Sequence, residues 1–299
     1  MKPRPKKSRG RREGGGDDGG VLREGLVTTR GRRHAVVDCD DGSRLRCEYD
    51  DALFDPGSPF THPVAAGDRA TIVEGRRGAR VVEVLPRKGR LSRMRGKKEQ
   101  VIVANVDRVL IVASAASPRF RPRLVDRMIV AAERAGFEPV VVVNKVDLAE
   151  VRTTFEETRD LYRGLGYRSY LVSANSGEGV DDVRAVVAKG ITAATGPSGV
   201  GKTTLLNLIN PGLGAATAPI SKRWGKGVHT TTRVVLHPLG DGAFYADTPG
   251  VRTFDVAGLA APDVAMLFRE FTPYIDACRF NSCSHDHEPE CAVKAAVVS

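Results

Sequence analysis

Two motifs stand in an unusual order along this chain, and their order constrains the fold more than any other feature. Residues 144–147 read NKVD, a base-reading motif of nucleotide-binding α/β domains, and residues 196–203 read GPSGVGKT, a phosphate-binding loop. In such domains the phosphate loop ordinarily precedes the base-reading motif. Here it follows, so the sequence predicts a circularly permuted domain in which two halves of an α/β fold have exchanged places.

Composition sets broad limits on the protein. Its 299 residues are 41% hydrophobic and 27% charged, which predicts a globular chain of more than one domain. The formal net charge of +10 favours a polyanionic partner, such as nucleic acid or an anionic membrane surface, with solubility alone as the alternative. No apolar run approaches the ~18 residues that span a bilayer, and no apolar stretch follows the basic N-terminus. We therefore expect no secretory signal and a cytoplasmic location.

The sequence pattern changes along the chain and predicts four segments. Residues 1–20 are basic and almost without apolar side chains, which indicates a disordered tail. Residues 21–97 show short strands and hairpin turns that suit an OB-fold barrel binding RNA, with an SH3-like barrel as the alternative and a basic linker at 88–98. Residues 98–257 alternate strands and helices, as in a doubly wound α/β domain, and residues 258–299 form a helical Cys/His-rich segment.

Within the α/β segment the apolar pattern places the elements around the motifs. Strands are expected at 107–113, 139–143 and 169–173, and helices at 122–136, 151–164 and 179–189. Residues 191–195, directly before the phosphate loop, are poor in large aliphatic side chains for a buried strand.

The phosphate loop is the strongest single motif. Its glycines let backbone N–H groups turn inward around phosphate oxygens, and the helix that follows adds its N-terminal dipole. Lys202 is expected to reach the β- and γ-phosphates, and the Thr203 hydroxyl is expected to bind Mg²⁺. The expected phosphate-binding set is Gly196, Pro197, Ser198, Gly199, Val200, Gly201, Lys202, Thr203 and Thr204.

The motif at 144–147 follows an apolar strand, at the sheet edge where nucleotides bind. Asp147 can accept hydrogen bonds from N1–H and the 2-amino group of guanine, which adenine does not offer. Asn144 would brace the loop and the base edge, and the stem of Lys145, next to Val146, would pack on the ring. Ser173-Ala174-Asn175 follows the next strand, and its backbone could contact the guanine O6. Alone, each motif could be an ordinary strand-end turn.

Two further motifs follow the phosphate loop and complete the nucleotide pattern. Asp247-Thr248-Pro249-Gly250 would hold Mg²⁺ through water at Asp247 and sense the γ-phosphate through the Gly250 N–H. Residues 229–232 read HTTT and resemble a switch segment, in which Thr231 would complete the Mg²⁺ shell. His229 is a candidate for positioning water, with a simple switch role as the alternative. Val251 stands where many GTPases have a water-orienting glutamine, so we expect slow intrinsic hydrolysis.

The C-terminal segment holds three of the five cysteines, and their odd number argues against a disulfide framework. Three thiolates and one imidazole there would form a closed, structural Zn²⁺ site. The expected ligands are Cys278, Cys283, His285 and Cys291. His287 is the alternative imidazole ligand. Cys39 and Cys47 lie in expected barrel strands and are interpreted as small buried hydrophobic residues.

Together these residues resemble the RsgA family of GTPases that depend on the small ribosomal subunit. The resemblance covers about residues 21–298 and rests on NKVD, SAN, GPSGVGKT, HTTT and DTPG in this order and on the C-terminal CRFNSCSHDHEPECAV. It implies an OB-fold, a circularly permuted GTPase domain and a zinc-binding domain. It also implies GTP, GDP and Mg²⁺ as ligands, hydrolysis stimulated by the 30S subunit and its 16S rRNA, a role in late maturation of that subunit, and a monomeric state.

Two other function classes stay open at this point. The chain could be an RNA-binding module that uses GTP and GDP only as conformational ligands, because Val251 cannot orient water. It could also be an ATP-using P-loop kinase or ATPase, against which Asp147 speaks. If the family reading holds, the permuted order puts the 247–252 segment next to the zinc domain and the OB-fold at the other end. Movement at 229–232 and 247–252 that depends on the γ-phosphate could then reposition the two RNA-binding domains against each other.

Overall fold

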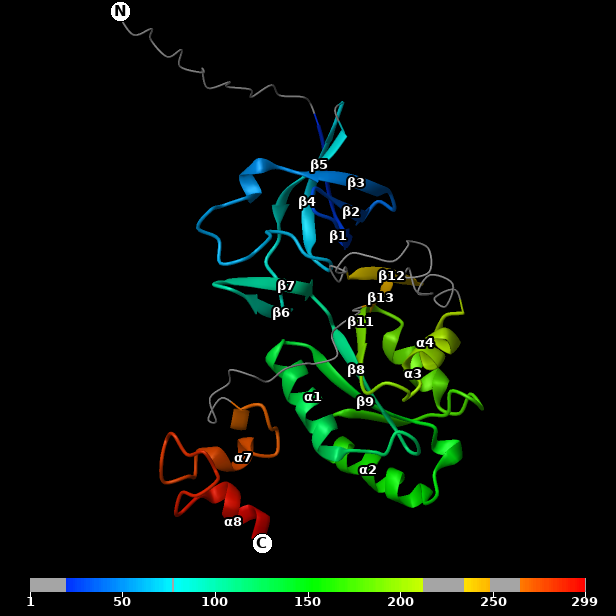
Figure 1. The fold of residues 1–299 in the computed structure, drawn as a ribbon, viewed down its shortest axis with the longest axis vertical. Helices are drawn as coiled ribbons and strands as arrows, with labels where there is room; N and C mark the ends of the chain where they lie inside the picture. Colours follow the sequence, from blue (N-terminus) through cyan, green and yellow to red (C-terminus); the bar gives the residue numbers. More distant parts are fainter. Residues whose placement is uncertain (1–19, 77, 212–233, 248–263, 299) are drawn as a thin grey trace, which may run out of the picture.

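The computed structural model of the chain describes residues 20–76, 78–211, 234–247 and 264–298. Three parts follow one another: an N-terminal barrel, a central α/β sheet and a small C-terminal unit (Figure 1). The barrel and the C-terminal unit lie at opposite ends of the molecule, with the sheet between them. The expected basic tail at 1–20 lies outside the described residues apart from Gly20.

Five strands form the N-terminal barrel. They are β1 (Val21–Arg30), β2 (His34–Cys39), β3 (Arg44–Tyr49), β4 (Arg69–Gly75) and β5 (Gly78–Val84), with a short 3-10 helix η1 (Asp51–Leu53) after β3. The pairs β1–β2, β2–β3 and β4–β5 are antiparallel, and the parallel pair β3–β5 and the antiparallel pair β1–β4 close the barrel. This closed order is that of an OB-fold, which confirms the expectation over the SH3-like alternative.

The barrel core consists of inward-facing aliphatic residues from alternate strand positions. Val27, Val37 and Ile72 are fully buried in it. Cys39 and Cys47 belong to the same core, as expected, and are 6% and 0% exposed. Burial raises the pKa of the Cys47 thiol to about 12, so it stays neutral and behaves as a small apolar side chain.

The expected linker at residues 88–98 is instead part of a hairpin, so that expectation is wrong. Strands β6 (Arg90–Arg95) and β7 (Lys98–Ala104) pair antiparallel, with Arg95 opposite Lys98. Gly96, with φ of 63°, supplies the left-handed backbone that the two-residue turn requires. Much of β6 is exposed and basic, so it lacks the alternation of apolar and polar residues that marks a strand.

Six strands form the central sheet, in the order β10-β9-β8-β11-β13-β12. Their bounds are β8 (Arg108–Ser114), β9 (Glu138–Asn144), β10 (Arg168–Leu171), β11 (Gly190–Thr195), β12 (Val235–Gly240) and β13 (Ala243–Asp247). Neighbours are parallel except for the antiparallel β12–β13 pair. The three expected strands are confirmed, and the segment poor in large aliphatics forms the central strand β11.

Helices cover both faces of this sheet, as the doubly wound expectation requires (Figure 1). Helices α1 (Pro122–Arg134) and α2 (Arg152–Gly164) lie on one face, and α3 (Val180–Val187) and α4 (Lys202–Ile209) on the other. The strand β8 shows why both faces are covered, because Val109 packs with the α1 side and Leu110 with the α3 side. Its near-continuous apolar sequence follows from burial on both faces.

The barrel and the central sheet are joined through backbone pairing. Thr29 of β1 pairs with Val235 of β12, so the strands form one continuous 11-stranded sheet. Val235 also pairs with Asp247 on its other side. One residue of β12 therefore connects the barrel to the strand that leads into the DTPG motif.

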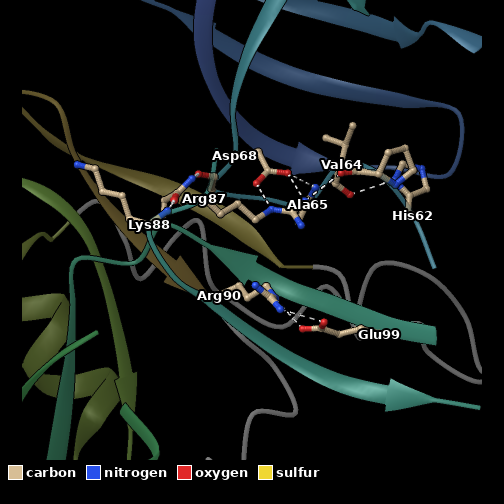
Figure 2. A network of polar contacts seen from close by, with 11 residues as sticks. His62, Val64, Ala65, Asp68, Arg87, Lys88, Arg90 and Glu99 are labelled. Carbon is tan, nitrogen blue, oxygen red and sulfur yellow. Dashed lines mark hydrogen bonds and ion pairs between the residues drawn. The ribbon is translucent and has the colours of Figure 1, made fainter. Parts of the chain in front are cut away.

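A polar network fixes the chain where it leaves the barrel (Figure 2). The fully buried carboxylate of Asp68 accepts hydrogen bonds of 2.7 and 2.8 Å from the Arg87 guanidinium and one of 2.7 Å from the Ala65 N–H. Arg87 also donates a 2.9 Å hydrogen bond to the carbonyl of Pro63. Because both charges are paired, burying them is tolerated, and removing one partner would leave a buried charge unpaired.

In the described part of the C-terminal unit, short helices lie at α7 (Thr272–Ile275) and α8 (Ala292–Val298). Arg269 attaches the unit to the central domain, since it forms an ion pair of 2.7 Å with Glu133 of α1 and donates a 2.7 Å hydrogen bond to the carbonyl of Gly166. Its guanidinium also lies over the Tyr167 ring, 4.3 Å from the centroid. None of the helices that the structure describes is long and apolar enough to span a membrane.

Candidate nucleotide site and metal centre

The phosphate loop connects the central strand β11 to the N-terminus of α4. Gly196, Gly199 and Gly201 have φ values of 140°, 82° and 94°, which L-residues with side chains rarely adopt. A Cβ atom at Gly196 would lie 2.1 Å from the carbonyl oxygen of Val112. The loop therefore needs glycine both for its backbone conformation and for its close approach to strand β8.

Lys202, the first residue of α4, places its ammonium group against the loop. Its Nζ donates hydrogen bonds of 2.7 Å to the carbonyls of Gly196 and Pro197. Thr203 and Thr204 are exposed in the first turn of the helix, and Ser198 and Gly199 are exposed at the loop tip. A cationic side chain, exposed hydroxyls and a helix N-terminus together fit the phosphates of a nucleotide.

Asn144 ties the base-reading motif to the phosphate loop. Its side-chain Nδ2 donates a 2.9 Å hydrogen bond to the carbonyl of Val200, and its Oδ1 accepts from the N–H groups of Lys145 (2.8 Å) and Ala174 (3.0 Å). A Cβ at Gly201 would lie 2.3 Å from that Nδ2. Three loops far apart in sequence thus meet on one buried amide.

Lys145 makes a second connection between the same loops. It adopts a left-handed backbone with φ of 65°, and its Nζ donates hydrogen bonds to the carbonyls of Gly199 (2.7 Å) and Ser117 (2.6 Å). The Lys145 side chain thus connects the base-reading motif to the phosphate loop and to the segment after β8. Its expected packing on a base stays a prediction.

The remaining base-reading residues lie at the same edge of the sheet. Asp147 is exposed in a 3-10 turn, η2 (Val146–Leu148), and its carboxylate accepts no hydrogen bond from the residues that the structure describes. Ser173 is fully buried, and its Oγ accepts from the N–H groups of Asn175 (3.3 Å) and Ser176 (3.0 Å). Ser173 thereby shapes the loop, and Asp147 keeps its acceptor oxygens available for a ligand.

Sequence reasoning missed the segment after β8. Ser114 ends that strand, and its Oγ donates to the carbonyl of Ser117 (3.2 Å), the carbonyl that also accepts from Lys145. Pro118 and Arg119 line a small depression together with Pro197 of the phosphate loop. The available signal was positional, because β8 lies between β9 and β11 and parallel strands end at one edge.

The residues expected to bind Mg²⁺ and water are only partly described. Asp247 is the last residue of β13, whose pairing with β11 reaches Ala193 opposite Ala246. The backbone of Asp247 therefore lies beside the end of the strand that leads into Gly196. His229, Thr231 and Gly250, as well as Val251, lie outside the described residues.

Four C-terminal side chains gather into a cluster that could hold a metal ion. The cluster consists of Cys278, Cys283, His285 and Cys291, whose ligand atoms all lie within 4.8 Å of one another. The Cys278 and Cys291 sulfurs are 4.0 Å apart, and the His285 Nδ1 is 3.4 Å from the Cys291 sulfur. Bonds of about 2.3 Å to a tetrahedral Zn²⁺ place two sulfurs about 3.8 Å apart, so the cluster fits zinc.

The loop between the cysteines is shaped by a side chain that the sequence reading did not single out. The Glu288 carboxylate accepts hydrogen bonds from the N–H (2.8 Å) and Oγ (2.6 Å) of Ser284. These hydrogen bonds hold the pKa of Glu288 well below its usual range. His287, the alternative imidazole ligand, is not among the four clustered residues.

Comparison with known proteins finds one family that this chain matches. The model of the family described as RsgA GTPase matches residues 84–257. The small ribosomal subunit biogenesis GTPase RsgA of Chlorobaculum parvum is 39% identical over 92% of both chains. The protein of the same name from Gemmatimonas aurantiaca is 42% identical over 78% of both chains.

Solved structures agree with the sequence matches. The crystal structure of YjeQ from Thermotoga maritima superimposes with a TM-score of 0.73, at 30% identity, covering 93% of this chain and 92% of that one. The structure of YloQ, described as a circularly permuted GTPase, gives a TM-score of 0.72 at 25% identity, covering 97% and 91%. The order of the motifs, the three-part fold and these matches lead to one conclusion: the chain belongs to the RsgA GTPase family and is a circularly permuted GTP hydrolase.

Proposed function

We propose that this protein hydrolyses GTP to GDP and phosphate, that the small (30S) ribosomal subunit stimulates the reaction, and that it acts in late maturation of that subunit. The observation that carries the proposal is the hydrogen bond from Asn144 to Val200, because it supports a base reader and a phosphate loop that act on one ligand. The names of the relatives, small ribosomal subunit biogenesis GTPases, support the choice of partner.

The Asn144–Val200 hydrogen bond joins the base-reading motif to the phosphate loop. We assign the guanine base of GTP to the base-reading motif and the phosphates to the loop. Asp147 reads the guanine edge, the backbone at Ser173 and Ala174 faces O6, and Lys145 with Val146 flanks the ring. The loop at 196–204 wraps the phosphates. Exposure of the Asp147 carboxylate and the left-handed glycines of the loop support this assignment.

Thr203, Thr231 and Asp247 would hold Mg²⁺, which when bound neutralises charge on the β- and γ-phosphates. The Gly250 N–H senses the γ-phosphate, and His229 is the candidate to position the attacking water, with a simple switch role as its alternative. Val251 has no group that can orient water, so intrinsic hydrolysis is slow. The ribosome then supplies or repositions a catalytic group.

The two terminal domains act as RNA-binding arms whose placement depends on the nucleotide. The pairing of Thr29 with Val235 supports this coupling at the barrel, since Val235 also pairs with Asp247. The barrel domain (21–97) contacts 16S rRNA, and so does the zinc domain (258–299), which one structural Zn²⁺ stabilises. The domain at 98–257 hydrolyses GTP. The protein works as a cytoplasmic monomer.

The switch is tested by measuring the affinity for purified 30S subunits with a non-hydrolysable GTP analogue and with GDP. The proposal expects the GTP state to bind at least about tenfold more tightly, because only the γ-phosphate can hold the switch segments in place. Equal affinities in the two states would contradict a nucleotide-driven switch.

A second candidate is an RNA-binding module in which GTP and GDP are only conformational ligands and turnover is incidental. Val251 favours it, because an aliphatic residue follows Gly250. In that case GTP would be hydrolysed equally slowly with 30S subunits, with 50S subunits and with bulk RNA.

A further inference from the structure

The exposed charge of helix α1 is arranged as one stripe of arginines. Arg123, Arg127 and Arg134 are all exposed. With 3.6 residues per turn, they fall within about 40° of one another around the helix and extend about 16 Å along its axis. We call these three residues the α1 stripe. Its opposite face is apolar and packs on the central sheet, as the burial of Val125 and Ile129 shows.

The two acidic residues of α1 lie to one side of the stripe around the helix, and each has a partner on another element. Asp126 accepts a 2.8 Å hydrogen bond from the hydroxyl of Tyr162 on α2, and Glu133 pairs with Arg269 of the C-terminal unit. The guanidinium groups of Arg123 and Arg127, in contrast, have no hydrogen bond or ion pair with any described part of the chain. The positive charges of Arg123 and Arg127 are therefore not neutralised by the described part of the chain.

The neighbouring helix α2 shows that this arrangement is not general in the domain. Arg152 pairs with Glu156, and Arg159 pairs with Asp160. Arg163 donates a 3.0 Å hydrogen bond to the carbonyl of Ser169. The three arginines of α2 are thus engaged within the chain, whereas Arg123 and Arg127 of α1 have no such partner among the described residues.

The stripe ends in a groove between α1 and the β6–β7 hairpin. The groove has a volume of about 740 Å³, and its basic lining residues are Lys88, Arg90, Arg93 and Arg134. Arg90 is neutralised by Glu99 at 2.7 Å, whereas Arg93 donates to the neutral amide of Gln100 and forms no ion pair with the described part of the chain. In Figure 2 the Lys88 side chain extends away from the Arg90–Glu99 pair. Arg134 belongs to both features, so the stripe and the groove form one basic surface.

We propose that the α1 stripe and this groove form a docking surface for the phosphodiester backbone of RNA. The inference deepens the proposed function and rests on it, since it names a surface through which the ribosomal RNA partner is held. Arginines in a row suit phosphates, which they bind through charge-assisted hydrogen bonds. A membrane-binding helix would need exposed apolar residues beside the charge, and a protein interface would need an apolar anchor. The apolar face of α1 is buried, and Met94 is the one large exposed hydrophobic residue among the described residues that line the groove, beside four basic side chains. Positive charge therefore dominates the surface, which favours phosphates over a membrane or an apolar protein interface.

The test compares two double variants that remove the same charge. Arg123→Gln with Arg127→Gln removes the unpaired part of the stripe. Arg159→Gln with Arg168→Gln is the control, since Arg159 pairs with Asp160 and Arg168 with Glu138 and neither belongs to α1 or to the groove. Binding of each to purified 30S subunits is measured with a GTP analogue over a range of salt concentrations. GTP affinity without ribosomes and the melting temperature show that each variant is folded.

The stripe variant is expected to bind 30S subunits about tenfold more weakly at low salt and to lower the slope of log K against log salt by about 1.5, while the control stays within about twofold of the wild type. Wild-type affinity and slope in the stripe variant would overturn the inference, as would an equal loss in the control. Binding of both variants to anionic phospholipid vesicles is measured in parallel. If the stripe variant lost binding to vesicles but kept binding to 30S subunits, the stripe would be a membrane-binding surface and the inference would be overturned. The proposed function fails separately, if 30S subunits leave wild-type GTP hydrolysis unchanged.

Discussion

The side-chain amide of Asn144 donates a hydrogen bond of 2.9 Å to the carbonyl of Val200, 56 residues further along the chain. Circular permutation changes the order of the loops along the sequence, but these loops still meet at the same edge of the sheet. Strands β9 and β11 flank β8 and are both parallel to it, so their carboxyl ends lie together. A single buried side chain can therefore connect the base-reading loop with the phosphate loop.

Replacing Asn144 with alanine should weaken both the fold and nucleotide binding. The Val200 carbonyl and the Ala174 N–H would lose their partner in a buried place, which costs about 2–4 kcal/mol of unfolding free energy. Denaturant unfolding and titration with GTP measure the two effects. Asn175→Ala is the control, because Asn175 is exposed in the neighbouring loop. Unchanged stability and GTP affinity in the Asn144 variant would show that the junction is not needed.

Asp147→Asn should change the base that the site prefers. The carboxylate can accept from guanine N1–H and the 2-amino group, and an amide cannot accept both. GTP affinity should fall about 100-fold or more, and xanthosine triphosphate should bind better than GTP. Calorimetric titration with both nucleotides measures this, with Glu150→Gln as an exposed control nearby. Retained selectivity for GTP would refute the role of Asp147.

Cys291→Ser should remove zinc and unfold the C-terminal unit. Serine is a poor Zn²⁺ ligand, and the small cluster of Cys283, Cys291 and Val293 offers little apolar burial without the metal. Metal analysis of the purified protein and limited proteolysis measure both effects. His287→Gln should keep a full complement of zinc. If His287→Gln lost the metal and Cys291→Ser kept it, the ligand set would be wrong.

The stability of the barrel should depend on pH through His62. Burial lowers the pKa of His62 to about 4, and its ring packs against Tyr49 at 4.8 Å and Phe54 at 5.4 Å between centroids. The unfolded chain, with an ordinary pKa of about 6.5, binds the proton more readily, so this contribution is present above about pH 6.5 and is lost as pH falls towards 4. Denaturant unfolding between pH 7 and pH 4.5 should show a steeper loss for the wild type than for His62→Gln. Parallel curves would contradict the assignment.

Much of the fold could be predicted because its signals are local. The apolar runs around Val141 and Leu110 mark strands buried on both faces, and the glycines at 196, 199 and 201 mark a phosphate loop. The four Cys and His residues of the C-terminal cluster lie close enough in sequence for their spacing to predict a metal site. In these cases one short segment carries both the chemistry and the backbone geometry.

The rest depends on neighbours that are distant in sequence. β11 looks weak because its small residues, such as Ala193, fit between two other strands in the sheet. Strand β6 has no apolar pattern that would predict it, because much of it is exposed and basic. The buried residues of the hairpin, Val101 and Val103, lie in its partner strand β7. The contact of Lys145 with Ser117 could not be predicted, because Ser114 and Ser117 belong to no motif and only the strand order brings them close.

The central claim is a GTPase that the small ribosomal subunit activates, and the most direct test is the rate of GTP hydrolysis with 30S subunits, with 50S subunits and with bulk RNA. Salt must be fixed, because a chain with net charge +10 binds RNA electrostatically in any case. Lys202→Ala serves as the control that should not hydrolyse GTP. A large stimulation by 30S subunits alone is the predicted result, and equal slow turnover in every mixture would contradict the account.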